Sequence, residues 1–74
     1  MRTIKFNISE SEGYYVADAE GYSIVTQAKT WSKLMQRIDD AVRLYFKLDI
    51  KENYKLELDI SSQALSMVKK SAKA

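Results

Sequence analysis

The sequence contains no cysteine, no histidine and no proline, and its only glycines are Gly13 and Gly21. Without cysteine there is no disulfide and no thiolate metal site, and without histidine the commonest general base and metal ligand are missing. We therefore expect no catalytic site, no metal site and no cofactor. No apolar run approaches the roughly 18 residues that cross a bilayer, and no signal-peptide pattern is visible. These absences predict a soluble, cytoplasmic protein with no membrane contact.

The length of 74 residues, with 46% apolar residues, indicates one small globular domain near the lower limit for a stable core. The net charge of +2 is too small to indicate nucleic-acid binding by itself. Basic residues gather late in the chain, at Lys69, Lys70 and Lys73. They are interpreted as a solvated tail or, alternatively, as a weak phosphate contact.

Alternation of apolar and polar residues predicts four strands. They span residues 2–8, 14–19, 22–27 and 54–60. Residues 9–13 are predicted to form a hairpin loop, and Glu20-Gly21 a tight turn.

A helix is predicted over residues 31–46, because apolar side chains recur there at intervals of three and four. Thr30 is a good N-cap, since its hydroxyl can accept a hydrogen bond from the first helical turn. A short last helix could begin at Ser61 or Ser62, with Leu65 and Val68 as its buried positions.

This order of elements predicts an α+β fold of the type βββαβ(α). Three strands form an antiparallel meander, and a crossover helix packs on one face of the four-stranded sheet and returns the fourth strand parallel to the first. The other face would stay open and carry Lys5, Tyr15 and Glu57. Strand 22–27 would be an edge without charge or proline, which favours pairing with a second copy as a homodimer or with another protein.

Several of these residues resemble the N-terminal domain of the HicB antitoxins, the partners of HicA toxins. The resemblance covers roughly residues 3–60 and rests on the order of its pieces. The pieces are Gly13-Tyr-Tyr-Val-Ala17, Gly21, Val25-Thr-Gln-Ala-Lys-Thr30, Trp31-x-x-Leu34, Ile38-x-x-Ala41 and Leu44-Tyr-Phe46.

The resemblance implies a partial ribonuclease-H-like domain, which we assign to residues 1–60. Residues 61–74 are expected to form a short helix or a frayed tail. The resemblance also implies a function, which is to bind and neutralise HicA, a small mRNA-cleaving toxin. Two positions depart from the family, because Ala28 stands at a usual glycine and Lys33 at a usual acidic residue. The DNA-binding segment typical of the family is missing, so no DNA binding is expected.

A nuclease is the enzymatic alternative that this fold suggests, with Asp18, Glu20, Asp39 and Asp40 holding magnesium. Two-metal catalysis needs several carboxylates that converge at ions about 4 Å apart. Asp39 and Asp40 are consecutive on a helix and point some 100° apart, and the other two flank a turn. We therefore do not expect enzymatic activity.

Partner-binding candidates come from the turns and the aromatic residues. A small basic toxin would be attracted by acidic groups, although solvated turns explain the same residues. The aromatic candidates could equally be packing residues. The full set is Glu10, Glu12, Tyr15, Asp18, Glu20, Tyr22 and Trp31. Two other functions stay open, namely a homodimerising module with no toxin and a weak RNA-binding domain.

Overall fold

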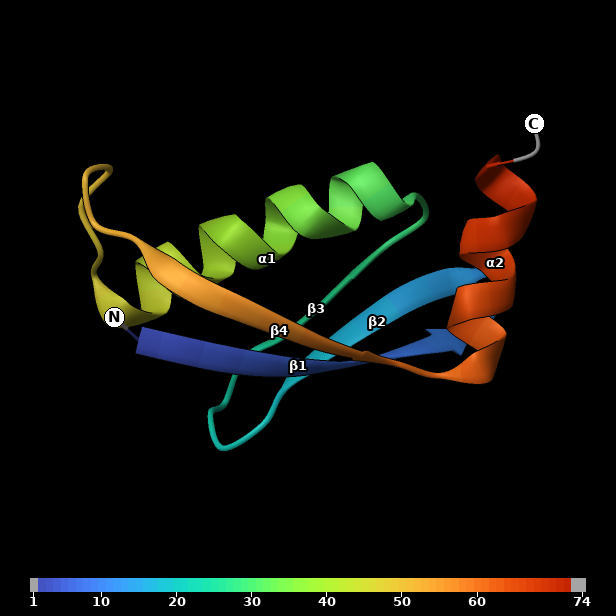
Figure 1. The fold of residues 1–74 in the computed structure, drawn as a ribbon, viewed down its shortest axis with the longest axis horizontal. Helices are drawn as coiled ribbons and strands as arrows, with labels where there is room; N and C mark the ends of the chain where they lie inside the picture. Colours follow the sequence, from blue (N-terminus) through green and yellow to red (C-terminus); the bar gives the residue numbers. More distant parts are fainter. Residues whose placement is uncertain (1, 73–74) are drawn as a thin grey trace.

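The computed structural model describes residues 2–72 as a four-stranded sheet with two helices (Figure 1). This α+β architecture confirms the predicted order of elements. The strands are β1 (Arg2–Ser11), β2 (Tyr14–Ala19), β3 (Val25–Ala28) and β4 (Tyr54–Ile60), and the helices are α1 (Trp31–Phe46) and α2 (Ser62–Ala72).

The strands lie in the order β3-β2-β1-β4, which leaves β3 and β4 at the edges as predicted. β1 pairs antiparallel with β2, and β2 pairs antiparallel with β3. β4 returns parallel to β1 after the crossover through α1. A parallel neighbour needs such a crossover, because a tight turn reverses the chain direction.

The first hairpin turn is shorter than predicted. Residues 9–13 are not a loop, because β1 continues to Ser11, which lies opposite Tyr14. Only Glu12 and Gly13 form the turn, with φ of 53° and 84°. Positive φ at both central residues matches the right-handed twist of the strands, and glycine adopts it without steric cost.

The third strand is also shorter than predicted, because it begins at Val25 and ends at Ala28. Gly21 takes a φ of 85°, and the turn extends through Tyr22 and Ser23. The Tyr22 ring packs against Phe46 of α1, with centroids 4.9 Å apart. Residue 22 therefore lies in the turn, with its ring on α1, and not in the sheet.

Helix α1 has the predicted bounds and the predicted cap. Thr30 accepts a hydrogen bond from the Lys33 N–H at 3.1 Å. Its buried side chains are those of Leu34, Ile38 and Val42. Burying each contributes about 1.5–3 kcal/mol relative to exposure, so this stripe fixes α1 on the sheet.

The face of the sheet beneath α1 includes Tyr15, which corrects the prediction that Tyr15 lies on the open face. Opposite residues of neighbouring strands share a face, and Ala17 lies opposite the fully buried Ile8. Tyr15 follows the same alternation and is only 1% exposed. The open face instead carries the side chains of Tyr14, Val16 and Asp18.

Helix α2 stands at one end of the sheet (Figure 1) and packs against β1. Ser61 caps it, because its hydroxyl accepts a hydrogen bond from the Ala64 N–H at 3.2 Å. The buried residue is Ala64, with Met67 and Val68 packed beside it. Leu65 is 41% exposed, so its predicted burial is wrong.

Of the late lysines, Lys69 and Lys70 lie exposed in the last turn of α2. Lys73 lies outside the described residues.

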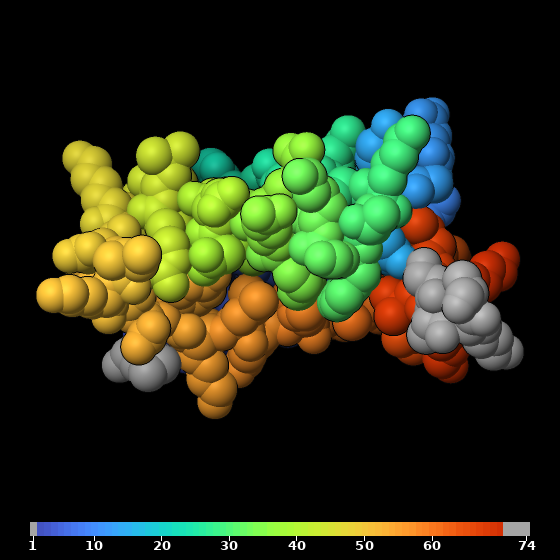
Figure 2. Space-filling model, turned by 90° about the horizontal axis from the view of Figure 1, so that it is seen from above, coloured from blue at the N-terminus to red at the C-terminus, as the bar shows by residue number. Residues whose placement is uncertain are grey.

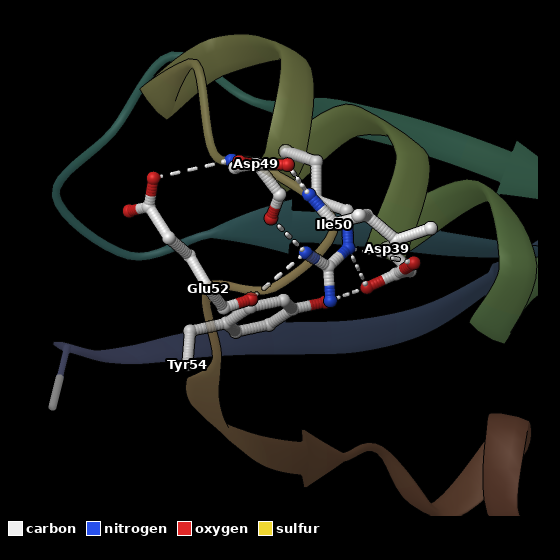
Figure 3. A network of polar contacts seen from close by, with 6 residues as sticks. Asp39, Asp49, Ile50, Glu52 and Tyr54 are labelled. Atoms are coloured by element: carbon white, nitrogen blue, oxygen red, sulfur yellow. Dashed lines mark hydrogen bonds and ion pairs between the residues drawn. The ribbon is translucent and has the colours of Figure 1, made fainter.

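Arg43 holds the connection from α1 to β4 by hydrogen bonds to Asp49 and Glu52. Figure 3 labels Asp49, Glu52 and Tyr54 within this network of polar contacts. The Arg43 guanidinium donates to the main-chain oxygens of Asp49 at 3.0 Å and Glu52 at 2.9 Å, and to the Asp39 carboxylate at 3.1 and 3.2 Å. The Tyr54 hydroxyl donates to the same carboxylate at 2.8 Å. Burial, together with the hydrogen bond to Asp39, raises the pKa of Tyr54 to about 12.

Candidate protein-binding surface

The open face of the sheet gathers carboxylates from different strands. At its centre Asn7 of β1 lies between Asp18 of β2 and Asp59 of β4, because all three are in register. Neighbouring strands are about 4.8 Å apart, so the two aspartates are roughly 10 Å apart at the backbone. Glu57 lies one position away on the same face, beside Lys5. Asp18, Asp59 and Glu57, which are far apart in the sequence, therefore form one acidic row on this face.

Lys5 pairs with Glu20, although Glu57 also lies opposite it in the sheet. Its Nζ lies 3.7 Å from the Glu20 carboxylate, in a pair with both side chains well exposed. Exposed pairs of this kind contribute at most about 1 kcal/mol. Within residues 2–72, the ion pairs are this one and Arg43–Asp39. The carboxylates of Asp18, Glu57 and Asp59 therefore face solvent without an ion-pair partner in the described part of the chain.

The charge of this face is opposite to that of the chain. Its strands and the Glu20 turn carry four carboxylates and two lysines, and Lys29 adds a third cation over the Tyr14 ring, so the net charge is −1, whereas the whole chain has +2. Because opposite charges steer encounter, the face suits a basic partner. Tyr14 and Val16 are half-buried beside the acidic row and add apolar area to it.

The four acidic residues predicted from the sequence do not form a single patch. Glu10 and Glu12 lie at the first hairpin turn, where Glu10 accepts a hydrogen bond from the Gly13 N–H at 3.1 Å. Asp18 and Glu20 lie near the opposite end of β2, which as a six-residue strand is about 17 Å long. Only the second pair joins the acidic row.

The aromatic candidates all contribute to packing. Trp31 meets the buried Tyr15 edge to face, with centroids 5.5 Å apart. Tyr22 packs on Phe46 but stays 37% exposed. Tyr15 is too deeply buried to contact a partner, whereas Tyr22 and Trp31 keep part of their surface accessible.

The residues that sequence reasoning missed are Asn7, Glu57 and Asp59 as neighbours of Asp18. The strand order could have indicated the acidic row, because the order β3-β2-β1-β4 places β2 and β4 on the two sides of β1. The register still had to be known to place Asp18 and Asp59 in one row.

A second surface runs along the outer edge of β3, where two hollows lie between the strand and α1. Figure 2 shows α1 lying along the length of the molecule above the sheet. The first hollow is basic, measures about 510 Å³ and is lined by Tyr14, Gln27, Ala28, Lys29, Thr30, Lys33 and Arg37. The second is uncharged, measures about 290 Å³ and is lined by Ser23, Ile24, Val25, Ala41, Leu44 and Tyr45.

The carboxylates considered for magnesium do not come together. Among residues 2–72, no three acidic side chains are close enough to hold a metal ion. Asp39 instead binds Arg43 and the Tyr54 hydroxyl. No helix in the described part of the chain is long and apolar enough to cross a membrane.

Comparison with known proteins finds a similar protein in Thermotoga maritima, described as a UPF0150 protein. It is 46% identical to this chain over 47 residues, which cover 62% of this chain and 67% of the relative. Its description states no activity, ligand or partner. No protein-family model matches the chain, and no solved structure matches it.

Proposed function

This chain belongs to the UPF0150 family, and we propose that it is an antitoxin-like protein that binds and neutralises a small, basic, mRNA-cleaving toxin of the HicA type. It would act in the cytoplasm, where such a toxin meets its RNA. The toxin class comes from the resemblance of residues 3–60 to HicB. The acidic row on the open face is the observation that supports this proposal best.

The acidic row suits such a partner for electrostatic reasons. An RNA-cleaving protein needs a basic surface to hold phosphates, and the same surface is attracted to a row of carboxylates. Asp18, Glu57 and Asp59 have no ion-pair partner within residues 2–72, so binding would not have to break existing pairs. A toxin bound there would have its RNA-contacting surface covered by the sheet.

Charge reversal tests this assignment. The double variant Asp18→Lys, Asp59→Lys places two cations where the toxin surface would lie. We expect it to lose protection of growth when co-expressed with a HicA-type toxin, and to lose complex formation in a pull-down. The matched control is Asp40→Lys, because Asp40 is exposed on the outer face of α1. Unchanged protection by the double variant, with both proteins folded, would contradict the proposal.

A homodimerising module without a toxin is the second candidate function. The uncharged edge at β3 favours it. This alternative would be supported if the purified chain self-associates stably and no toxin binds to it.

A further inference from the structure

The outer edge of β3 presents free main-chain groups in a defined pattern. The Ala19 N–H donates to the Ile24 oxygen at 2.9 Å, so residue 24 bonds toward β2. Main-chain groups alternate in direction along a strand, which turns those of Thr26 and Ala28 toward β2 as well. The N–H and C=O groups of Val25 and Gln27 therefore point outward. Within residues 2–72, no turn, loop or cap hydrogen bond uses them.

The two edges of the sheet differ in their protection. β4 carries Lys55, Glu57 and Asp59, and charged side chains hinder unwanted pairing at an edge. β3 has the sequence Val-Thr-Gln-Ala, with no charge and no proline. Large apolar side chains are exposed beside it, since Val25 is 67%, Leu44 82% and Tyr45 48% exposed.

We propose that this edge binds the β3 edge of a second copy of the chain, antiparallel, with Thr26 of each copy facing the other across a two-fold axis. This is the register in which the outward groups meet. Val25 of each copy exchanges two hydrogen bonds with Gln27 of the other, giving four main-chain bonds in all. Thr26 lies in the non-hydrogen-bonded pair between them, where cross-strand threonine pairs are favourable.

Side chains around the edge are complementary in this arrangement. Antiparallel pairing sets the uncharged hollow of each copy against the basic hollow of the other. Leu44 and Tyr45 then meet the apolar stem and the guanidinium of Arg37 from the second copy. Each contact occurs twice, as two-fold symmetry requires.

The geometry has a consequence for partner binding that rests on the proposed function. A two-fold axis perpendicular to the sheet keeps both open faces on the same side. The dimer would thus be one eight-stranded sheet with two acidic rows side by side, able to hold two toxin molecules.

A single cysteine tests the register, because the chain has none of its own. Cα atoms of a non-hydrogen-bonded antiparallel pair lie about 4.5 Å apart, within the range that a disulfide spans. We expect Thr26→Cys to form a disulfide-linked dimer under mild oxidation at micromolar concentration. The control is Ile50→Cys, at an exposed position on the α1–β4 connection. Linkage of Thr26→Cys no faster than that of Ile50→Cys would overturn the proposal.

Sedimentation equilibrium gives an independent measurement. We expect the wild-type chain to be a dimer and Val25→Pro to weaken dimerisation by about tenfold or more, since proline removes the outward N–H of Val25 in each copy and with it two of the four main-chain bonds. Ile50→Lys should leave the dimer unchanged. A wild-type monomer at several hundred micromolar would overturn the proposal. If the chain dimerises but binds no toxin, only the proposed function is refuted. If the chain binds the toxin as a monomer, only the proposed dimer is refuted.

Discussion

Arg43 should be among the most important polar residues for stability, and its replacement by alanine provides a direct test. The change removes two hydrogen bonds to the carbonyls of Asp49 and Glu52 and two to the Asp39 carboxylate. Hydrogen bonds from a charged group contribute about 1.5–3 kcal/mol each when buried, but water can replace much of that at these exposed sites. We therefore expect a loss of about 2 kcal/mol in the free energy of unfolding.

A loss of that size is large for this chain. Stabilities of about 0.05–0.15 kcal/mol per residue suggest a total of only about 4–11 kcal/mol. In a domain of this length, 2 kcal/mol corresponds to a fall in Tm of roughly 8–16 °C. Urea denaturation followed by circular dichroism would measure the free energy directly, and a thermal scan would measure Tm.

Arg37→Ala is the matched control, because Arg37 lies on the same helix and is exposed. It removes the same side chain without disturbing the connection, so we expect a change within about 0.5 kcal/mol when both variants are measured at a concentration low enough for the chain to be monomeric. Arg43→Lys should recover little, because an ammonium group cannot reproduce the fork of the guanidinium. Equal stability of the Arg43→Ala and Arg37→Ala variants would refute the role given to Arg43.

Two further predictions concern the core and the pH dependence of stability. Ile38→Ala should cost about 2–5 kcal/mol in urea denaturation because Ile38 is fully buried, whereas Leu44→Ala should cost far less because Leu44 is 82% exposed; similar losses would contradict the assigned core. The pKa of Tyr54 is about 12 in the fold and about 10 when unfolded, so between these values the folded state holds the proton more tightly and stability falls as pH rises. Tyr54→Phe should reduce that fall in denaturation midpoints measured from pH about 9 to 12, and an unchanged slope would count against the hydrogen bond to Asp39.

Much of the fold could be predicted from the sequence because its periodic segments are clear. The bounds of β2, α1 and β4 are those predicted, since each segment has a clean alternation or an apolar stripe. The first hairpin was misjudged because Ser9 and Ser11 lie on the solvent side of a strand end, where polar residues look the same as a loop. Tyr15 was placed on the wrong face because the adjacent rings of Tyr14 and Tyr15 give no signal of which is buried.

The candidate surface was harder to predict for a geometric reason. Asp18 and Asp59 become neighbours only through the register of β1 with both β2 and β4, and a shift of one residue would turn one of them to the other face. The buried position of α2 was missed because Ala64 is small. Its burial reflects a close approach of α2 to the sheet, which hydrophobicity alone does not reveal.

The parallel pairing of β1 with β4 also shapes how the chain reaches its fold. Residues 2–8 of β1 each pair with a residue that lies 52 positions later, as Arg2 does with Tyr54. During synthesis the first hairpin and α1 can form before β4 leaves the ribosome. Until then one side of β1 has no neighbour, although β1 is a central strand in the finished sheet. The growing chain is therefore most exposed to wrong pairing at a strand that the folded protein covers on both sides.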